Sequence, residues 1–191
     1  MAKLVGARLR GHRFLNAKLS AAIAAQGFPQ DLPSAPDRTM NLLNLPSTVC
    51  AIGDVHGRAD LLRLLIDFLD DQSARAPQPP RVYFLGDIVD RGPDSRQAME
   101  IVCETLRRWP ESRFVMGNHD WLFRDGLTSQ LLVHDWLERG AINTLASYLG
   151  DSDSYTFDDL WLIKDRYPEH LRILQSASLI ERIGKYAFIR H

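Results

Sequence analysis

Three short polar blocks that begin with glycine constrain the fold of this chain most strongly. They lie about 30 residues apart, at 53–58 (GDVHGR), 86–92 (GDIVDRG) and 117–120 (GNHD). An apolar run precedes each block, and these runs cover residues 48–52, 82–85 and 114–116. Because the runs are short, rich in β-branched and aromatic residues and bounded by glycine or proline, they predict buried strands. Each block is therefore expected at the C-terminal end of a strand.

The segments between the blocks have helical periodicity. Apolar residues recur at i, i+3 and i+4 over residues 61–69 and again over 98–106, where Asp94 or Ser95 is the expected N-cap and Pro110 the stop. The resulting order is βαβαβ. Crossovers of this length give parallel neighbours in one sheet with helices on its faces, so we expect an α/β fold. Ligands bind at the carboxyl edge of such sheets, where the three blocks would converge.

The blocks hold oxygen and nitrogen ligands that suit divalent cations. Asp54, His56 and Asp87 supply carboxylate and imidazole groups of the kind that bind Mn, Fe or Zn, and Asn118 adds an amide oxygen. In the simplest assembly Asp87 bridges two ions, Asp54 and His56 bind the first, and Asn118 binds the second. Two ions about 3.5–4 Å apart can steady the attacking and leaving oxygens at phosphorus. The blocks therefore predict a metal-assisted phosphoesterase that uses water as its nucleophile.

Three further residues of the blocks suit the remaining steps of this chemistry. His119 lies beside a ligand and suits a general acid for the leaving alkoxide, and Asp90 can orient its imidazole. Arg91 has the planar guanidinium that grips phosphate oxygens in pairs. One Gly-Asp pair is most often a turn and one histidine most often structural, so the prediction depends on the three blocks occurring together at βαβ spacing.

With these blocks the chain resembles the calcineurin-like metallophosphoesterases. The blocks are similar to the GDxHG, GDxVDRG and GNH(E/D) signatures of the phosphoprotein phosphatase branch, and residues 90–95, 136–140 and 144–148 are similar to bacterial serine/threonine phosphatases. The symmetrical diadenosine tetraphosphate hydrolases share the three blocks. The resemblance implies the βαβαβ start of a calcineurin-like α/β sandwich.

The resemblance also implies a function and the residues that perform it. The implied activity is hydrolysis of phosphoserine or phosphothreonine in a protein, with two divalent ions as cofactors and Mn favoured over Fe or Zn. The alternatives are hydrolysis of dinucleoside polyphosphates and a catalytically impaired relative that binds phosphate or a partner. The implied metal ligands are Asp54, His56, Asp87 and Asn118. The implied catalytic residues are His119, Asp90 and Arg91.

The end of the chain departs from the family pattern. Relatives carry two later histidine motifs, each with a metal ligand, and the first follows a strand that residues 186–189 resemble. His191 stands one residue further from Phe188 than the ligand does in relatives, and such a slip turns a side chain to the other face of a strand. His191 would therefore bind metal only if a bulge absorbs the slip. We expect a C-terminally truncated domain whose second sheet is incomplete.

Charge divides the chain into two parts. The first 30 residues hold five Lys or Arg and no Asp or Glu, which leaves 18 basic and 24 acidic residues in the remainder. Residues 1–46 lie outside the resemblance, and we expect them to be a disordered extension before one domain over residues 47–191. A transit peptide and translation from Met40 are the alternatives. The acidic body suits a cation site and argues against a nucleic-acid partner.

Two absences indicate the cellular setting. Cys50 and Cys103 have neither metal nor disulfide spacing, and no apolar stretch approaches 18 residues. We therefore expect a cytoplasmic protein without a membrane partner, acting on a phosphorylated protein or a small phosphoester.

The part of the chain after the third block is expected to be mostly helical. The pattern predicts helices from His119 to Tyr148, a loop over residues 150–159, and a further helix that begins at Pro168, a favoured first position. Packing aromatics are expected at Trp121, Trp136 and Trp161, and surface or boundary histidines at His134 and His170.

Overall fold

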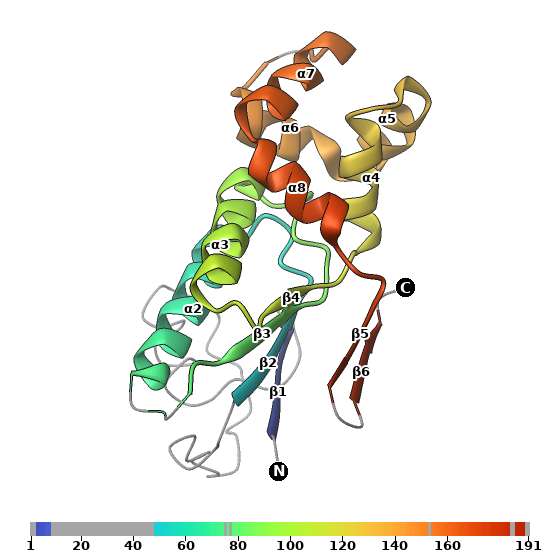
Figure 1. Ribbon diagram of the computed structural model, residues 1–191. Helices are drawn as coiled ribbons and strands as arrows, with labels where there is room; N and C mark the ends of the chain where they lie inside the picture. The colour runs from blue at the N-terminus through green and yellow to red at the C-terminus, as the bar shows by residue number, and fades with distance from the viewer. Residues whose placement is uncertain are drawn as a thin grey trace, which may run out of the picture.

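The computed structural model describes residues 3–8, 48–74, 76, 78–152, 154–183 and 186–189. Strands and helices alternate in its first half, and a run of helices then leads to a terminal hairpin (Figure 1). The fold is the mixed α/β architecture that the sequence predicted.

A parallel four-stranded sheet lies at the base of the molecule. Its strands, in spatial order, are β1 (Lys3–Arg8), β2 (Thr48–Gly53), β3 (Arg81–Phe84) and β4 (Arg113–Phe114). All neighbouring pairs are parallel, and Ile52, Phe84 and Phe114 lie in one row across the sheet. The three predicted strands are therefore present as β2, β3 and β4. The last is shorter than expected because Val115 instead forms an isolated bridge with Ser178.

Strand β1 departs from the expectation of a disordered extension. Lys3–Arg8 pairs with β2 along its whole length, from Lys3 opposite Thr48 to Arg8 opposite Gly53. The run Leu-Val within this segment suits a strand that joins a parallel sheet. Residues 9–47 lie outside the described residues, so the predicted domain boundary between 46 and 47 stays a prediction.

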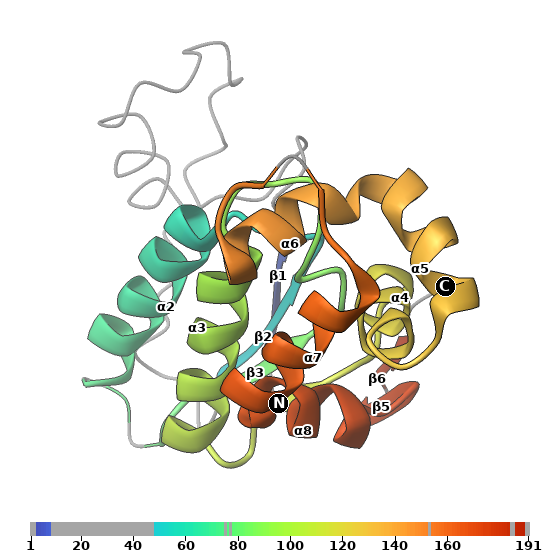
Figure 2. The same ribbon diagram turned by 90° about the horizontal axis from the view of Figure 1, so that it is seen from above.

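The two crossover helices were predicted correctly and cover one face of the sheet. They are α2 (Ala59–Ser73) and α3 (Ser95–Arg108), which lie side by side in both views (Figures 1 and 2). Asp94 is the N-cap residue of α3, and Pro110 follows its end. The apolar faces of both helices share one core with alternate residues of β2 and β3 such as Ile52 and Phe84.

The opposite face of the sheet is covered by a hairpin. Its strands are β5 (Ile180–Ile183) and β6 (Tyr186–Ile189), which pair antiparallel as a second, two-stranded sheet. Phe188 of β6 stacks on Tyr83 of β3 with ring centroids 4.7 Å apart, beside Val49 and Ala51. The predicted strand at 186–189 is thus confirmed.

The remaining helices gather above the carboxyl ends of the strands. They are α4 (Asn118–Gly126), α5 (Gln130–Trp136), the π-helical turn η2 (Leu137–Ala141), α6 (Ile142–Leu149), α7 (Phe157–Arg166) and α8 (Pro168–Ser176). The predicted loop over 150–159 ends earlier than expected, because Thr156 and Asp159 form a reciprocal capping box that starts α7 at Phe157.

The expectations for three single residues in these helices were wrong. Trp136 is fully buried as predicted, but Trp121 and Trp161 are 41% and 59% exposed. His170, expected near the surface, is buried and bonds to Tyr148.

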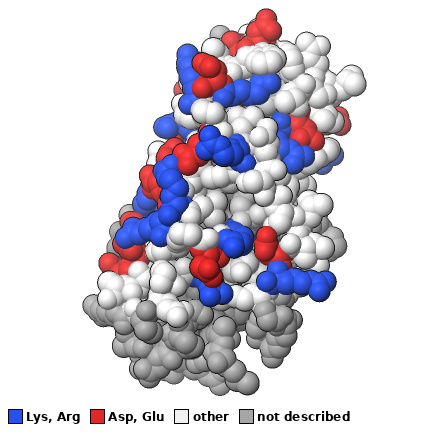
Figure 3. All heavy atoms as spheres, viewed as in Figure 1, with Lys and Arg blue, Asp and Glu red and all other residues white. Residues whose placement is uncertain are grey.

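No described helix has the length and apolar character needed to cross a membrane. Basic and acidic side chains are interspersed on the face shown in Figure 3.

Candidate metal centre and active site

The loops that follow β2 and β3 are joined through their backbones. The amide of His56 donates to the carbonyl of Asp87 at 2.8 Å, and the amide of Gly57 donates to the carbonyl of Ile88 at 2.7 Å. A third, longer bond runs from the amide of Asp54 to the carbonyl of Gly86. The first two polar blocks are therefore one rigid unit, as their place at the carboxyl ends of neighbouring parallel strands predicts.

The third block meets this unit at two glycines. Gly86 has a φ of +78°, and a Cβ atom there would lie 2.3 Å from the amide nitrogen of Gly117. A Cβ atom on Gly117 would in turn lie 2.3 Å from the amide nitrogen of Asp87. Only glycine permits so close an approach of two backbones. These two glycines therefore bring the start of α4 against Asp87.

The backbone of the first two blocks is strained where the functional side chains are attached. Five non-glycine residues of the described chain have a positive φ, and all five are predicted site residues: Asp54, His56, Asp87, Asp90 and Arg91. Their φ values lie between 46° and 71°. Such conformations cost of the order of 1–3 kcal/mol each and cluster at functional sites, where the surrounding structure holds them.

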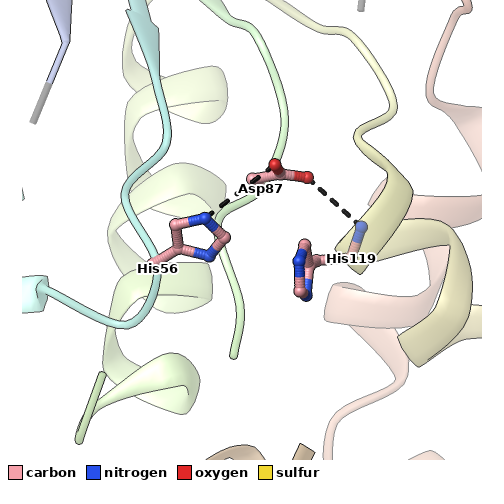
Figure 4. A group of neighbouring side chains, drawn as sticks. All are labelled: His56, Asp87 and His119. Atoms are coloured by element: carbon pink, nitrogen blue, oxygen red, sulfur yellow. Dashed lines mark hydrogen bonds and ion pairs between the residues drawn. The ribbon is translucent and has the colours of Figure 1, made fainter. Parts of the chain in front are cut away.

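One buried group of side chains can hold a metal ion. His56, Asp87 and His119 each offer a ligand atom, and these atoms all lie within 4.8 Å of one another. Figure 4 shows the two imidazoles and the carboxylate around a common point, with His56 and Asp87 on loops and His119 on α4. The Nε2 atom of His56 lies 3.9 Å from Oδ2 of Asp87, and the amide of His119 donates to Oδ1 of Asp87.

The protonation of His56 suits a metal ligand. Its Nδ1–H donates to the carbonyl of Val89 at 3.0 Å, which leaves Nε2 as the unprotonated ring nitrogen, 3.9 Å from Oδ2 of Asp87. Burial lowers the pKa of His56, so the neutral imidazole that a metal requires is favoured. The residues present therefore fit a divalent ion at this point.

Arg91 reaches the same point from the second block. Its Nη1 donates to Nε2 of His56 at 3.1 Å, and its Nη2 donates to Nε2 of His119 at 2.9 Å. Both imidazole lone pairs are therefore directed toward the guanidinium. The sequence predicted Arg91 at the phosphate position, and the structure places it between the predicted ligand His56 and the predicted acid His119.

Two other predicted ligands are close in the chain to members of this group. Asp54 is half-buried on the same loop as His56, and Asn118 is exposed as the first residue of α4. His191 lies outside the described residues. The group of three closely spaced donors thus contains two predicted ligands and the predicted acid His119. The ligand roles of Asp54, Asn118 and His191 stay predictions.

Asp120 is a site residue that the sequence interpretation missed. Its buried carboxylate accepts hydrogen bonds from four backbone amides, those of Asp87, Ile88, Val89 and Gly117. Burial raises the pKa of Asp120 to about 7, and the Asp87 carboxylate adds to the rise while the amides oppose it. Because it grips both the second and third blocks, Asp120 fixes the backbone that carries Asp87. Its place as the third residue of α4 was the available signal, since an acidic side chain there can cap the helix.

The predicted dyad is present. Nδ1 of His119 donates to Oδ2 of Asp90 at 2.8 Å, and both side chains are buried. The Asp90 carboxylate also accepts hydrogen bonds from Trp136 and Thr144, two residues of the later helices to which the sequence interpretation gave no role in the site. With Nδ1–H held by Asp90, Nε2 of His119 faces the same space as Nε2 of His56.

Two comparisons with known proteins agree with this geometry. The family model for the calcineurin-like phosphoesterase domain matches residues 47–184, which include all three blocks. Among curated proteins, the "Serine/threonine-protein phosphatase PP2A-like PPG1" of Candida albicans (strain SC5314) is 34% identical over 85 residues, or 44% of this chain and 19% of that protein. The chain thus matches about a fifth of the length of this relative.

Proposed function

This chain belongs to the calcineurin-like phosphoesterase family, and on that premise we propose that it is a metal-dependent serine/threonine protein phosphatase. The observation that carries the proposal is the buried group of His56, Asp87 and His119 beside Asp90. It places metal-ligand chemistry and a histidine–carboxylate pair within one small volume. The name of the Candida relative supports a phosphorylated protein as the substrate.

We propose that the family's divalent ions bind at this group. Asp87 and His56 would hold them together with Asp54 and Asn118, and manganese is the ion we favour. When bound, such ions supply Lewis-acid charge and lower the pKa of the attacking water. The chain's own contribution is to present metal-ligand atoms that carry no proton. The bond from His56 Nδ1–H to the carbonyl of Val89 leaves Nε2 unprotonated, and the amide of His119 fixes the Asp87 carboxylate.

The remaining residues would bind the phosphoryl group and protonate the leaving oxygen. The guanidinium of Arg91 lies beside both imidazole Nε2 atoms, and from there we expect it to bind the equatorial oxygens of a phosphate. His119 would act in its doubly protonated form, delivering the proton on Nε2 to the serine or threonine oxygen as the ester bond breaks and returning to the neutral imidazole with Nδ1–H on Asp90. Asp90 would stabilise the imidazole through Nδ1–H throughout that transfer.

Kinetics with two kinds of substrate test this proposal. The 191-residue chain should hydrolyse a phosphoserine peptide when Mn, Fe or Zn is added and lose that activity with a chelator. Diadenosine tetraphosphate should be a poorer substrate by at least tenfold in kcat/KM. The exposed α2 carboxylate variant Asp67→Asn is the matched control, and its rates should equal those of the wild type.

Three outcomes separate the alternatives. Preference for diadenosine tetraphosphate would replace the protein phosphatase by a dinucleoside polyphosphate hydrolase. Metal binding without turnover of either substrate would identify a catalytically impaired relative. Turnover that persists at full rate in the presence of a strong chelator would contradict a metal-dependent reaction altogether.

A further inference from the structure

The carboxylate of Asp90 is enclosed by donors from a distant part of the chain. Trp136 at the end of α5 donates its Nε1–H to both oxygens of Asp90 at 3.1 and 3.0 Å. The hydroxyl of Thr144 in α6 donates to Oδ1 at 2.7 Å. Together with Nδ1–H of His119 on Oδ2, these bonds surround a side chain that is 0% exposed.

The hydrogen positions around Asp90 follow from the chemistry of its partners. The indole of Trp136 is only a donor, so it requires an acceptor oxygen. Thr144 Oγ1 accepts the amide N–H of Asp90 at 2.9 Å, and its own hydrogen is therefore free for the Asp90 carboxylate. Ser95, 2.9 Å from Thr144 Oγ1, then donates to that oxygen. Every partner offers a hydrogen to the carboxylate, so Asp90 acts only as an acceptor and its Oδ2 is directed at His119.

The same distant segment also holds the backbone of Arg91. The carbonyl of Gly140 accepts the amide of Arg91 at 3.3 Å, and Nδ2 of Asn143 donates to the carbonyl of Arg91 at 2.6 Å. Asp90 and Arg91 have φ values of 71° and 69°, so each needs outside contacts to stay in that conformation. Residues 136–144, here called the positioning segment, make these contacts to both.

We propose that Trp136 and Thr144 are positioning residues for the acid step, and that they act by fixing the Asp90 carboxylate so that His119 keeps Nε2 turned toward the leaving oxygen. The proposal rests on the proposed function and deepens it. It also gives a role to Trp136 and Thr144, two residues that lie outside the three polar blocks.

Simple packing is the competing explanation for the same residues. Trp136 is fully buried and lies 5.4 Å from Phe123 between ring centroids, so its replacement will lower stability in either case. A residue that only packs should affect all substrates alike. A residue that positions a general acid should matter most for a leaving group that needs a proton.

Substrate comparison distinguishes the two explanations. Thr144→Val keeps the shape and removes the hydroxyl, and Trp136→Phe removes the indole N–H. We expect both to lower kcat for phenyl phosphate, a poor leaving group, by about 10–100-fold, part of the contribution of general acid catalysis. We expect kcat for p-nitrophenyl phosphate, a good leaving group, to fall less than about threefold, and Thr144→Ser to restore the wild-type ratio of the two rates.

Tyr148→Phe is the matched control, one turn further along α6. It also loses a buried hydroxyl, which bonds to Nδ1 of His170 at 2.8 Å, but that hydroxyl has no contact with Asp90. Its ratio of rates on the two phosphates should equal that of the wild type, whatever its stability. A change of that ratio as large as in Thr144→Val would overturn the proposal.

A second readout needs no turnover. The Nδ1–H of His119 should give a downfield NMR resonance that His119→Asn removes. In Thr144→Val and Trp136→Phe we expect this resonance to shift, or its proton to exchange faster with solvent. In Tyr148→Phe the resonance should stay unchanged. If the variants leave both the resonance and the substrate ratio unchanged, the two side chains only pack and the proposal is wrong. If the wild type hydrolyses no phosphoester, the proposed function fails while the resonance still decides the positioning role.

Discussion

The two halves of the site are held in different ways. The half that we propose to bind metal, around His56 and Asp87 and here called the metal half, is fixed by backbone bonds between neighbouring loops and by the Asp120 carboxylate, which accepts hydrogen bonds from four backbone amides. The acid half, around Asp90, is fixed by side chains from helices 46 and 54 residues further along the chain. The first half depends on loop geometry next to a sheet, whereas the second depends on how a helical layer packs above it.

This difference predicts how each half responds to change. Backbone bonds between loops survive most side-chain substitutions, so the metal half should fail only when a ligand, a close-approach glycine or Asp120 is altered. Side-chain bonds can be removed one at a time, so the acid half should lose function in steps. The predictions below test that separation, beginning with the largest expected effect.

The largest effect should come from the ligand common to the metal group. Asp87→Asn should weaken Mn binding by more than about 100-fold, beyond the loss usual for residues that only support a ligand. His119→Asn should change the Mn affinity less than about threefold while lowering kcat by about 10²–10⁴-fold, the range for general acid catalysis. Calorimetry and steady-state kinetics measure the two quantities.

His119 makes this pair of variants decisive. Its imidazole belongs to the group of donors within 4.8 Å, so the geometry alone permits a ligand role. A large loss of Mn affinity in His119→Asn would make it a ligand and remove the boundary between the two halves. Full-strength Mn binding by Asp87→Asn would contradict the metal half as described.

Two fully buried carboxylates offer the next comparison. Asp120→Asn leaves one oxygen for four amide donors and turns an NH₂ group toward them, so the loop that carries Asp87 should loosen. We expect Mn affinity to fall about 10–100-fold, as for other supporting residues. Asp90→Asn, its control in the acid half, should lower kcat without changing that affinity more than about threefold. Equal losses of affinity in both variants would show that the two halves are one unit.

The meeting of the three blocks was predictable from the sequence because its determinants are local. A glycine and a carboxylate follow each of three apolar runs, and a histidine follows two of them; parallel pairing then brings these loops together. His56 and Asp87 accordingly lie where the pattern placed them. Asp120 was missed because the sequence alone does not distinguish a carboxylate that binds amides of another loop from one that only caps its own helix.

The acid half was only partly predictable for a different physical reason. The pairing of His119 with Asp90 follows from adjacent blocks, but the contacts of Trp136 and Thr144 depend on the path of the chain through α5, η2 and α6. That path includes a π-helical turn in which Gly140 has a φ of 100°, and no periodic pattern of apolar residues encodes such a turn. The start of α7 at Phe157 was also missed. The run of polar residues before it suggested a loop, whereas the capping box of Thr156 and Asp159 stabilises the first turn of a helix there.

A smaller effect is expected from the glycine that turns the positioning segment. Gly140→Ala places a side chain at a positive φ, a strain of about 1–2 kcal/mol, and its Cβ would lie 3.4 Å from Cγ of Arg91. The thermal midpoint should fall by about 2–4 °C for each kcal/mol lost. Activity should fall several-fold in kcat/KM because the backbone of Arg91 moves.

Gly150→Ala is the matched control for that variant. Gly150 also has a positive φ, of 90°, but nothing lies within 4 Å of the position of a Cβ atom. Its midpoint should fall as well, while kcat/KM stays at the wild-type value. If both variants lose activity in proportion to their stability, the segment has no separate influence on Arg91.

The smallest effect concerns the pH dependence of the helical layer behind the acid half. His170 is 2% exposed and lies between the hydroxyl of Tyr148 and the carboxylate of Glu100. Burial lowers its pKa below the ordinary 6.5, although Glu100 opposes this. The unfolded chain then binds more protons than the folded chain as the pH falls through that value, so the free energy of unfolding should decrease toward acid pH.

A comparison of two histidine variants isolates this contribution. His170→Gln should be less stable than the wild type at pH 8, and the gap should narrow toward pH 5.5 by at most about 1.4 kcal/mol for each pH unit. His134→Gln, which alters a histidine whose side chain is 79% exposed, should differ from the wild type equally at both pH values. Urea denaturation measures the gaps. If the gap for His170→Gln widens toward acid pH, the buried imidazole is charged in the folded protein, and α6 is then held by an ion pair with Glu100.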